Sequence, residues 1–441
     1  MNNSIVVSAL LAALCFAAGP ARAQADPQPK TIFVKAGRLL DVKSGSYLSQ
    51  AGVWIEGARI KQVGPASDIQ QHLPAEATVI DLNGATVLPG LIDCHTHLLA
   101  RFSSSPDGYI LALAKKSQAY RALEGAANAK ATLLAGFTTV RDVENEGSGY
   151  ADVALRDAIE AGLVEGPRMK VATRGIAAVG QYNPFGVSPD LTDFPQGAQM
   201  ISGVEEARRA VREQIGYGAD LIKIYADWMY PTLTVEEMRV VVEEAHKAGR
   251  KVAAHATTVD GIHNAIIAGV DSIEHGHRAD LKAIEMMKAR GVFLVPTVGV
   301  VDRATERHKN EPLDPQRAQQ RAAFLQGIQQ AVQMAMKNGV KIAVGFDASG
   351  EALHGRNAQE LISLVSRGLT PLEAIRAATL NGAELIGWQD SVGAIEAGRY
   401  ADLIAVQGDP IQDIAVLTHV SFVMKGGSVV SSEGALNRAL R

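Results

Sequence analysis

Two histidines separated by one residue carry the strongest chemical signal in the sequence. They are His95 and His97, and they end a short apolar run that begins at Leu88. If this run is a β-strand, both imidazoles point to the same face, because side chains alternate along a strand. Two imidazoles directed at one point from rigid backbone form half of a metal site. The remaining ligands must then come from other parts of the chain.

Polar residues also end four other apolar runs. Each residue type has an ordinary structural role: a histidine can be hydrogen-bonded in a core, a lysine can reach solvent and an aspartate can cap a helix. Their joint occurrence at the ends of runs instead predicts a metal site. The residues are Lys223 and Tyr225, His255, His275 followed by His277, and Asp347.

The apolar runs alternate with longer helical stretches, which is the pattern of βα units and a parallel sheet. Eight units predict an α/β fold of the (β/α)8 TIM barrel type, in which catalytic residues lie at the C-terminal ends of the strands. The polar residues described above fall at those ends. The runs cover residues 88–98, 138–143, 169–173, 221–225, 251–256, 272–276, 292–297 and 341–347.

Short strand-like segments flank the barrel region and predict a small β-sandwich domain formed from both chain ends. The N-terminus has an apolar stretch over residues 5–18 and a small-residue cleavage site at Ala21-Arg22-Ala23. This pattern predicts a signal peptide that is cleaved near Ala23, and hence a periplasmic or secreted protein. The expected domains are a signal peptide (1–23), an N-terminal β-sandwich segment (24–87), the metallohydrolase barrel (88–390), and a C-terminal β-sandwich segment with a tail (391–441).

The composition of the chain limits the classes of partner that we expect it to bind. The 441 residues carry a formal net charge of −4 and show no basic cluster, which argues against a nucleic-acid partner. No apolar run after the N-terminal one is long enough to span a bilayer, so we expect no membrane contact in the mature form. Removal of Cys15 with the signal peptide would leave Cys94 alone, without an intramolecular disulfide. We expect a small-molecule substrate and a homo-oligomer.

Several motifs together resemble the metal-dependent amidohydrolase superfamily, from about residue 30 to about residue 430. Within it, the chain is most similar to Xaa-Pro dipeptidase-type and imidazolonepropionase-related amidohydrolases. The motifs are Pro89-Gly-Leu-Ile-Asp-Cys-His-Thr-His97, Gly136-Phe-Thr-Thr-Val-Arg-Asp142, Ala254-His-Ala256, Glu274-His-Gly276, Gly345-Phe-Asp347 and Gly398-Arg-Tyr-Ala-Asp-Leu403.

This resemblance implies a centre of two divalent metal ions, expected to be Zn²⁺. One metal would be held by His95, His97 and Asp347, and the other by His255 and His275. Lys223 would bridge both metals as a carbamate formed with CO2. The alternative is a site with one metal, in which Lys223 is a plain structural residue, as in imidazolonepropionase-like and deaminase-like members.

The resemblance also implies hydrolysis of an amide bond by a metal-bound hydroxide, with Asp347 transferring the proton to the leaving amine. His277 would bind substrate or a transition-state oxygen. Tyr225 and Arg141 are candidates for binding a substrate carboxylate, while Tyr182 and His354 lie in loops that would reach the pocket.

The expected substrates are dipeptides, N-acyl amino acids or amides of the ochratoxin type. The alternatives are a cyclic-amide hydrolase or deaminase, and a metal-holding binding module without activity.

Overall fold

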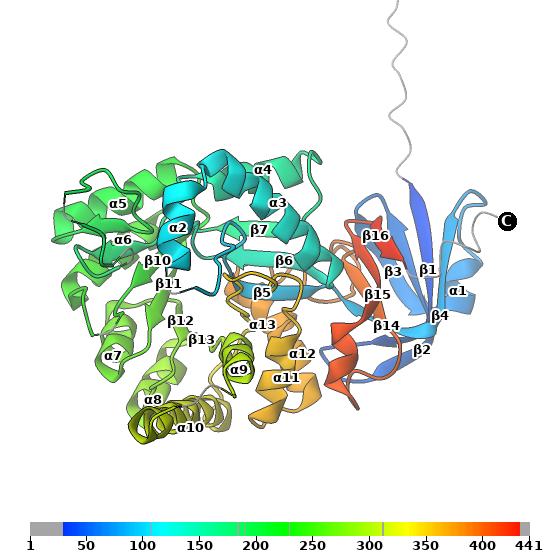
Figure 1. Cartoon of the computed structure of the whole chain (residues 1–441). Coiled ribbons are helices and arrows are strands. Elements are labelled where there is room, and N and C mark those ends of the chain that lie inside the picture. The colour runs from blue at the N-terminus through cyan, green and yellow to red at the C-terminus, as the bar shows by residue number, and fades with distance from the viewer. Residues whose placement is uncertain are drawn as a thin grey trace, which may run out of the picture.

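The computed structural model describes residues 30–432 except 106, 183, 184, 189, 229, 311 and 312. The predicted signal peptide and the residues from 433 onward lie outside these ranges. The described chain forms a sheet domain beside a larger α/β domain (Figure 1). Within the described residues, no helix is long and apolar enough to cross a membrane.

The sheet domain is built from both ends of the described chain, as predicted. Its seven strands form one sheet in the order β16-β15-β14-β4-β1-β2-β3, rather than two separate sheets. Strand β4 joins the two ends, because it pairs in parallel with β1 and antiparallel with β14. The strands are β1 (Thr31–Leu40), β2 (Tyr47–Glu56), β3 (Arg59–Pro65), β4 (Thr78–Pro89), β14 (Leu403–Val406), β15 (Val420–Lys425) and β16 (Ser428–Ser432).

The first predicted run, 88–98, is divided between the two domains. Strand β4 ends at Pro89, and the first barrel strand, β5, spans Leu91–Thr96. The division falls at Gly90, where a Cβ atom would lie 2.1 Å from Oγ1 of Thr138. Only glycine permits this close approach of the backbone to the neighbouring strand.

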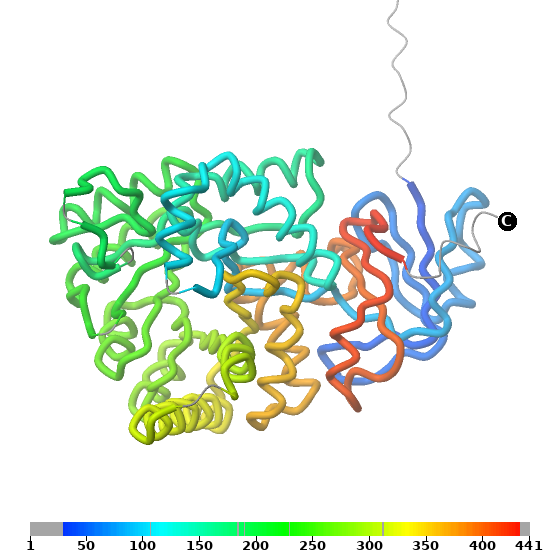
Figure 2. The backbone as a smooth tube through the Cα atoms, viewed as in Figure 1, coloured from blue at the N-terminus to red at the C-terminus, as the bar shows by residue number. Residues whose placement is uncertain are grey.

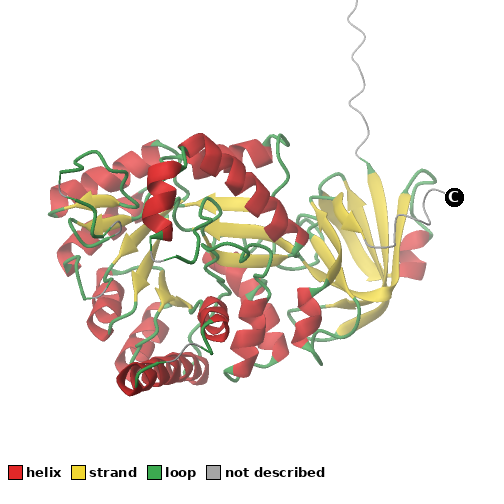
Figure 3. Cartoon of the chain, in the orientation of Figure 1, coloured by secondary structure: helices red, strands yellow, loops and turns green. Residues whose placement is uncertain are grey.

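The α/β domain contains the predicted succession of parallel strands with surrounding helices (Figure 3). One sheet has the order β13-β12-β11-β10-β8-β9, and a second has the order β5-β6-β7. Besides β5, the strands are β6 (Phe137–Asp142), β7 (Arg168–Val171), β8 (Ile176–Ala178), β9 (Gln199–Ile201), β10 (Leu221–Tyr225), β11 (Lys251–Ala256), β12 (Ser272–His275) and β13 (Phe293–Val295).

Backbone contacts link the two parallel sheets on both sides. The N–H of Asp220, just before β10, donates to the carbonyl of Val171 at the end of β7 over 2.8 Å. The segment 341–348 forms isolated parallel bridges from Ile342 to Leu294 and from Ala348 to Thr96. The eighth predicted run thus lies between β13 and β5 without forming a regular strand, and the fold is of the TIM barrel type.

Helices surround these strands and cover their outer side (Figures 1 and 2). Their buried apolar residues join those of the strands in one large core. The helices are α2 (Gly108–Lys115), α3 (Gln118–Leu134), α4 (Ala151–Glu160), α5 (Val204–Gly216), α6 (Val235–Lys247), α7 (Val259–Ala268), α8 (Leu281–Arg290), α9 (Val298–Arg307), α10 (Pro315–Lys337), α11 (Gln359–Ser366), α12 (Pro371–Ala377) and α13 (Leu380–Leu385). The sheet domain carries α1 (Ala66–Gln70) and the 3-10 helix η1 (Ile414–Thr418).

Candidate metal centre

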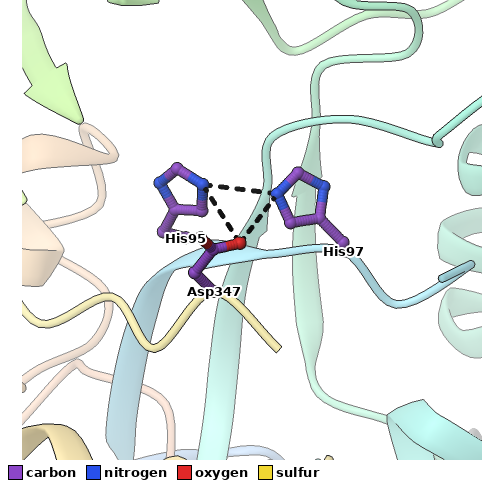
Figure 4. A group of neighbouring side chains, drawn as sticks. All are labelled: His95, His97 and Asp347. Carbon is purple, nitrogen blue, oxygen red and sulfur yellow. Dashed lines mark hydrogen bonds and ion pairs between the residues drawn. The ribbon is translucent and has the colours of Figure 1, made fainter. Parts of the chain in front are cut away.

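Three predicted ligands converge at the C-terminal end of β5 (Figure 4). The Nε2 atoms of His95 and His97 lie 3.3 Å apart. Oδ1 of Asp347 lies 3.2 Å from Nε2 of His97 and 3.8 Å from Nε2 of His95. Ligand atoms about 2.0–2.2 Å from a tetrahedral zinc ion lie about 3.3 Å from one another. The spacing of these three atoms therefore fits a metal ion.

Two further histidines lie beside this group. His275 ends β12, and its ring centroid lies 5.0 Å from that of His95. His255 of β11 lies next to it, with 4.5 Å between the centroids of His255 and His275. All four histidines predicted as ligands thus form one continuous row at the C-terminal ends of β5, β12 and β11.

Hydrogen-bond partners fix one ring nitrogen on each of three histidines. Nδ1 of His95 lies 2.7 Å from Oε2 of Glu274. Nδ1 of His275 lies 2.8 Å from Oγ1 of Thr297, and Nδ1 of His97 lies 3.2 Å from Oε1 of Glu146. Such partners orient metal-binding imidazoles and leave the opposite nitrogen, here Nε2, to face a metal.

Lys223 of β10 lies in the same pocket and is 1 % exposed. Its amine makes no hydrogen bond or ion pair with any described residue. Burial lowers the pKa of the Lys223 amine below its ordinary value and outweighs the nearby Glu274 carboxylate. A buried amine without such a partner is costly as an ammonium ion, so this position favours a neutral amine that is open to modification.

Buried carboxylates behind the ligands differ in their protonation. Burial alone would raise the pKa of Glu274, but Arg141, whose Nη2 lies 2.8 Å from Oε1 of Glu274, and His95 hold it well below its usual range. Burial also opposes ionisation of Asp347, but the neighbouring imidazoles lower the pKa of its carboxyl group to about 2. By contrast, burial and the charge of Glu146 raise the pKa of Glu144 to about 8.

Several of these residues adopt backbone conformations that are unusual outside glycine. The φ angles are positive for His275 (70°), Asp347 (58°), Thr297 (49°) and Glu146 (53°). Each such conformation costs free energy and persists only where the surrounding structure enforces it. Strained residues are therefore concentrated where the strands end and the site is formed.

Tyr225 and Tyr182 line the pocket, as the sequence predicts, but both face carboxylates. The hydroxyl of Tyr225 donates to Glu144, and that of Tyr182 donates to Oε2 of Glu146 over 3.0 Å. The pocket has a volume of about 210 Å³. Its wall at the end of β6 is therefore acidic.

Three other residues predicted to act on the substrate do not line this pocket. Arg141 is buried and donates to the carbonyl of Cys94 over 2.6 Å and to Glu274. His277 lies with Nε2 3.2 Å from the carbonyl of Pro296, and His354 with Nε2 2.8 Å from the carbonyl of Ala100. The placement of these residues gives no support to their predicted substrate roles.

Sequence reasoning assigned no role to Glu144, Glu146 or Glu274. A signal for the first two is present, because carboxylates recur at every second position in Asp142-Val-Glu-Asn-Glu146 after a predicted strand. Glu274 directly precedes a predicted ligand in Glu274-His-Gly276. Glu146 lines the pocket, Glu144 accepts the hydroxyl of Tyr225, and Glu274 positions His95.

The chain is similar to several known proteins. The amidohydrolase family model matches residues 86–430. The chain is 32 % identical to the ochratoxinase of Aspergillus niger over 442 aligned residues, covering 92 % of this chain and 88 % of that protein. The crystal structure of that ochratoxinase has a TM-score of 0.81 at 29 % identity, covering 92 % of this chain and 97 % of the other.

A crystal structure of a Xaa-Pro dipeptidase with methionine bound in the active site is also similar. It has a TM-score of 0.80 at 35 % identity and covers 91 % of this chain and 99 % of the dipeptidase chain. The family match covers most of the chain, and all of the predicted metal ligands lie within the matched residues. The chain therefore belongs to the amidohydrolase family and is a hydrolase that acts on amide bonds.

Proposed function

We propose that the protein is a binuclear metal-dependent amidohydrolase that cleaves the amide bond of dipeptides or N-acyl amino acids. The observation that carries this proposal is the convergence of His95, His97 and Asp347 beside a buried lysine that has no hydrogen-bond partner among the described residues. A peptide-like substrate is supported by similarity to a dipeptidase that binds an amino acid in its active site.

Six side chains would hold two divalent metal ions, expected to be Zn²⁺. Metals there would polarise the amide carbonyl and lower the pKa of a bound water. Lys223, carboxylated on Nζ by CO2, would carry the negative charge that a bridging ligand needs. The first metal would be held by His95, His97 and Asp347, the second by His255 and His275, and both by the Lys223 carbamate.

In this proposal, different residues of the chain have different roles in hydrolysis. Water adds to the amide carbon, the C–N bond breaks, and the products are a carboxylic acid and an amine. The Asp347 carboxylate, which faces the ligand cluster, would accept the proton from the water and deliver it to the leaving nitrogen. Glu274 and Thr297 would keep His95 and His275 in position during turnover.

A hydrolysis screen tests the proposal. Purified protein without the predicted signal peptide (1–23) would be loaded with Zn²⁺ in the presence of bicarbonate and offered dipeptides and N-acyl amino acids that vary on both sides of the amide bond. We expect two metals per chain and release of free amino acids. One metal per chain, with ring opening or ammonia release from cyclic substrates, would instead support a cyclic-amide hydrolase or deaminase.

A further inference from the structure

The hydrogen bonds of Tyr225 and Arg141 leave no free donor for a substrate carboxylate beside Tyr225. The hydroxyl of Tyr225 already donates to Glu144, and Glu146 lies on the same wall. Arg141, expected to pair with the carboxylate, is occupied by Glu274 and backbone groups. A carboxylate placed there would find no free hydrogen-bond donor on Tyr225 or Arg141, and burial without a donor is unfavourable. If the substrate has a free carboxylate, it must bind elsewhere.

A second cavity adjoins the metal pocket. It has a volume of about 350 Å³ and shares two lining residues, Phe102 and Ser349, with the metal pocket. Ser349 follows the metal-site residue Asp347 by two positions. Helix α9, which begins three residues after β13 ends, forms another wall of this cavity.

One face of α9 lines the cavity. The lining residues Val300, Arg303, Ala304 and Arg307 are separated by three, four and seven positions from the first, which places them on one side of a helix. The charged residues that line this cavity are Arg303 and Arg307 together with Glu306 and Glu351.

Arg303 lacks the partner that a partly buried guanidinium normally has. Its Nε atom is buried without a hydrogen bond, and its guanidinium has no ion pair within the described chain. The two acidic residues of the same helix already have other cationic partners. Asp302 pairs with Arg367 at 2.6 Å, and Glu306 pairs with Lys309. A buried N–H group without an acceptor costs free energy, which a bound anion would recover.

We propose that Arg303 binds the carboxylate of the amino acid that leaves after amide hydrolysis. The proposal rests on the proposed function and names the place where such substrates are recognised. A planar guanidinium pairs with a carboxylate through two parallel hydrogen bonds, which fixes orientation as well as affinity. The scissile amide would then lie at the metal pocket while the carboxylate lies in the adjoining cavity.

Matched substrates test this assignment. N-acyl-L-phenylalanine and the corresponding C-terminal amide differ only in the carboxylate. In the zinc-loaded enzyme, Arg303→Met should lower the acid-to-amide ratio of kcat/KM by about 10- to 100-fold, mainly through KM for the acid. Arg303→Lys should retain an intermediate ratio. Arg209→Met removes an exposed guanidinium from α5, outside both cavities, and as the control should change the ratio by less than about threefold.

Other outcomes would contradict the proposal. An equal loss with both substrates, or an unchanged ratio, would remove Arg303 from carboxylate recognition while leaving the hydrolase function intact. A loss confined to substrates with a side-chain carboxylate, such as N-acyl glutamate, would overturn recognition of the α-carboxylate. If the wild-type enzyme hydrolyses neither substrate, the proposed function fails. Calorimetric titration with L-phenylalanine then decides separately: equal affinity in wild type and Arg303→Met would refute the inference.

Discussion

At the scale of single residues, the proposal of two metals depends on Lys223. The histidines and Asp347 have the geometry of a metal site whether or not Lys223 takes part. In the proposed centre Lys223 would supply the bridging anion, because its amine is buried and has no hydrogen-bond or ion-pair partner within the described residues. The binuclear proposal therefore depends on one side chain more than on the paired histidines.

Lys223→Ala should lower kcat/KM by at least about 100-fold, because the chemistry contributed by catalytic metals amounts to several kcal/mol. Metal content should fall from two ions per chain to about one. Added acetate or propionate should restore part of the activity by replacing the carbamate. Lys251→Ala is the control, since Lys251 lies at the other end of the neighbouring strand and donates to the carbonyl of Glu384. Full activity of the Lys223 variant without additive would refute the binuclear model.

Glu274 connects Arg141 to His95 and should control metal affinity. Glu274→Gln keeps the shape of the side chain but removes the charge that holds Nδ1 of His95. We expect metal affinity to fall by about 10- to 100-fold, as is usual when a partner of a metal ligand is lost. Competition with a chelator, followed by elemental analysis, measures this change.

The control for Glu274 is Glu384→Gln, which removes a surface carboxylate paired with Lys341. Its metal affinity should equal that of the wild type. If Glu274→Gln also bound metal like the wild type, Glu274 would have only a packing role. A loss of equal size in both variants would point to a nonspecific effect of charge.

At the scale of elements, the ligands could be predicted because strands and helices impose simple periodicities. Side chains alternate along β5 and β10, so residues two apart reach the same pocket. The spacing of Glu146 from Asp142 and Glu144 is visible in sequence, but the direction of its side chain and the cavity beside α9 could not be predicted in this way. Glu146 lies in a loop, and α9 is positioned by contacts with α11, which is far along the chain. Such non-local packing leaves no periodic pattern in sequence.

Arg141 illustrates the same limit. Its position near the end of β6 correctly placed it close to the metal ligands. The direction of its guanidinium depends on Glu274 and on the carbonyl of Cys94, which come from other strands. Proximity to the site was predictable from sequence, whereas the choice between substrate and structural partners was not.

Glu360 of α11 fixes the start of α9, and its protonation should affect stability. Its carboxylate oxygens accept the backbone N–H groups of Val298 at 3.0 Å and Gly299 at 2.5 Å. Burial raises the pKa of Glu360 from its ordinary value of 4.5 to about 8. The folded state then binds more protons than the unfolded state between these values. The free energy of unfolding should therefore fall as pH rises through this window.

Glu360→Gln should remove this contribution, because an amide does not titrate. Between pH 5 and 8 the wild type should lose stability relative to the variant, by at most about 1.4 kcal/mol per pH unit. Urea unfolding at several pH values measures the difference. The control, Glu237→Gln, alters a capping-box carboxylate whose pKa is lowered, so its contribution is constant in this window. Parallel curves for wild type and Glu360→Gln would contradict the prediction.

At the scale of the whole molecule, the sheet domain and the barrel are joined covalently, where the chain passes from one to the other, and by several polar contacts. Arg168 at the start of β7 pairs with Asp402, just before β14, through Nε at 3.0 Å and Nη2 at 3.3 Å. The same guanidinium lies 3.6 Å from the ring centroid of Tyr400. The amine of Lys425 in β15 donates to the carbonyl of Gly166. These contacts hold the N-terminal side of the barrel strands against the sheet.

Asp402→Asn should destabilise the protein by about 1–3 kcal/mol, because it leaves a largely buried guanidinium without its counter-charge. The amide can still accept the N–H of Gly426, so the backbone turn should be kept. Glu165→Gln is the matched control, since it breaks an ion pair with Lys130 in which both side chains are exposed, and it should cost less than about 1 kcal/mol. Urea unfolding of both variants measures the difference. Equal effects would mean that Arg168 and Asp402 behave as a surface pair, and the sheet and barrel would then be held together mainly by apolar packing and by the covalent crossings.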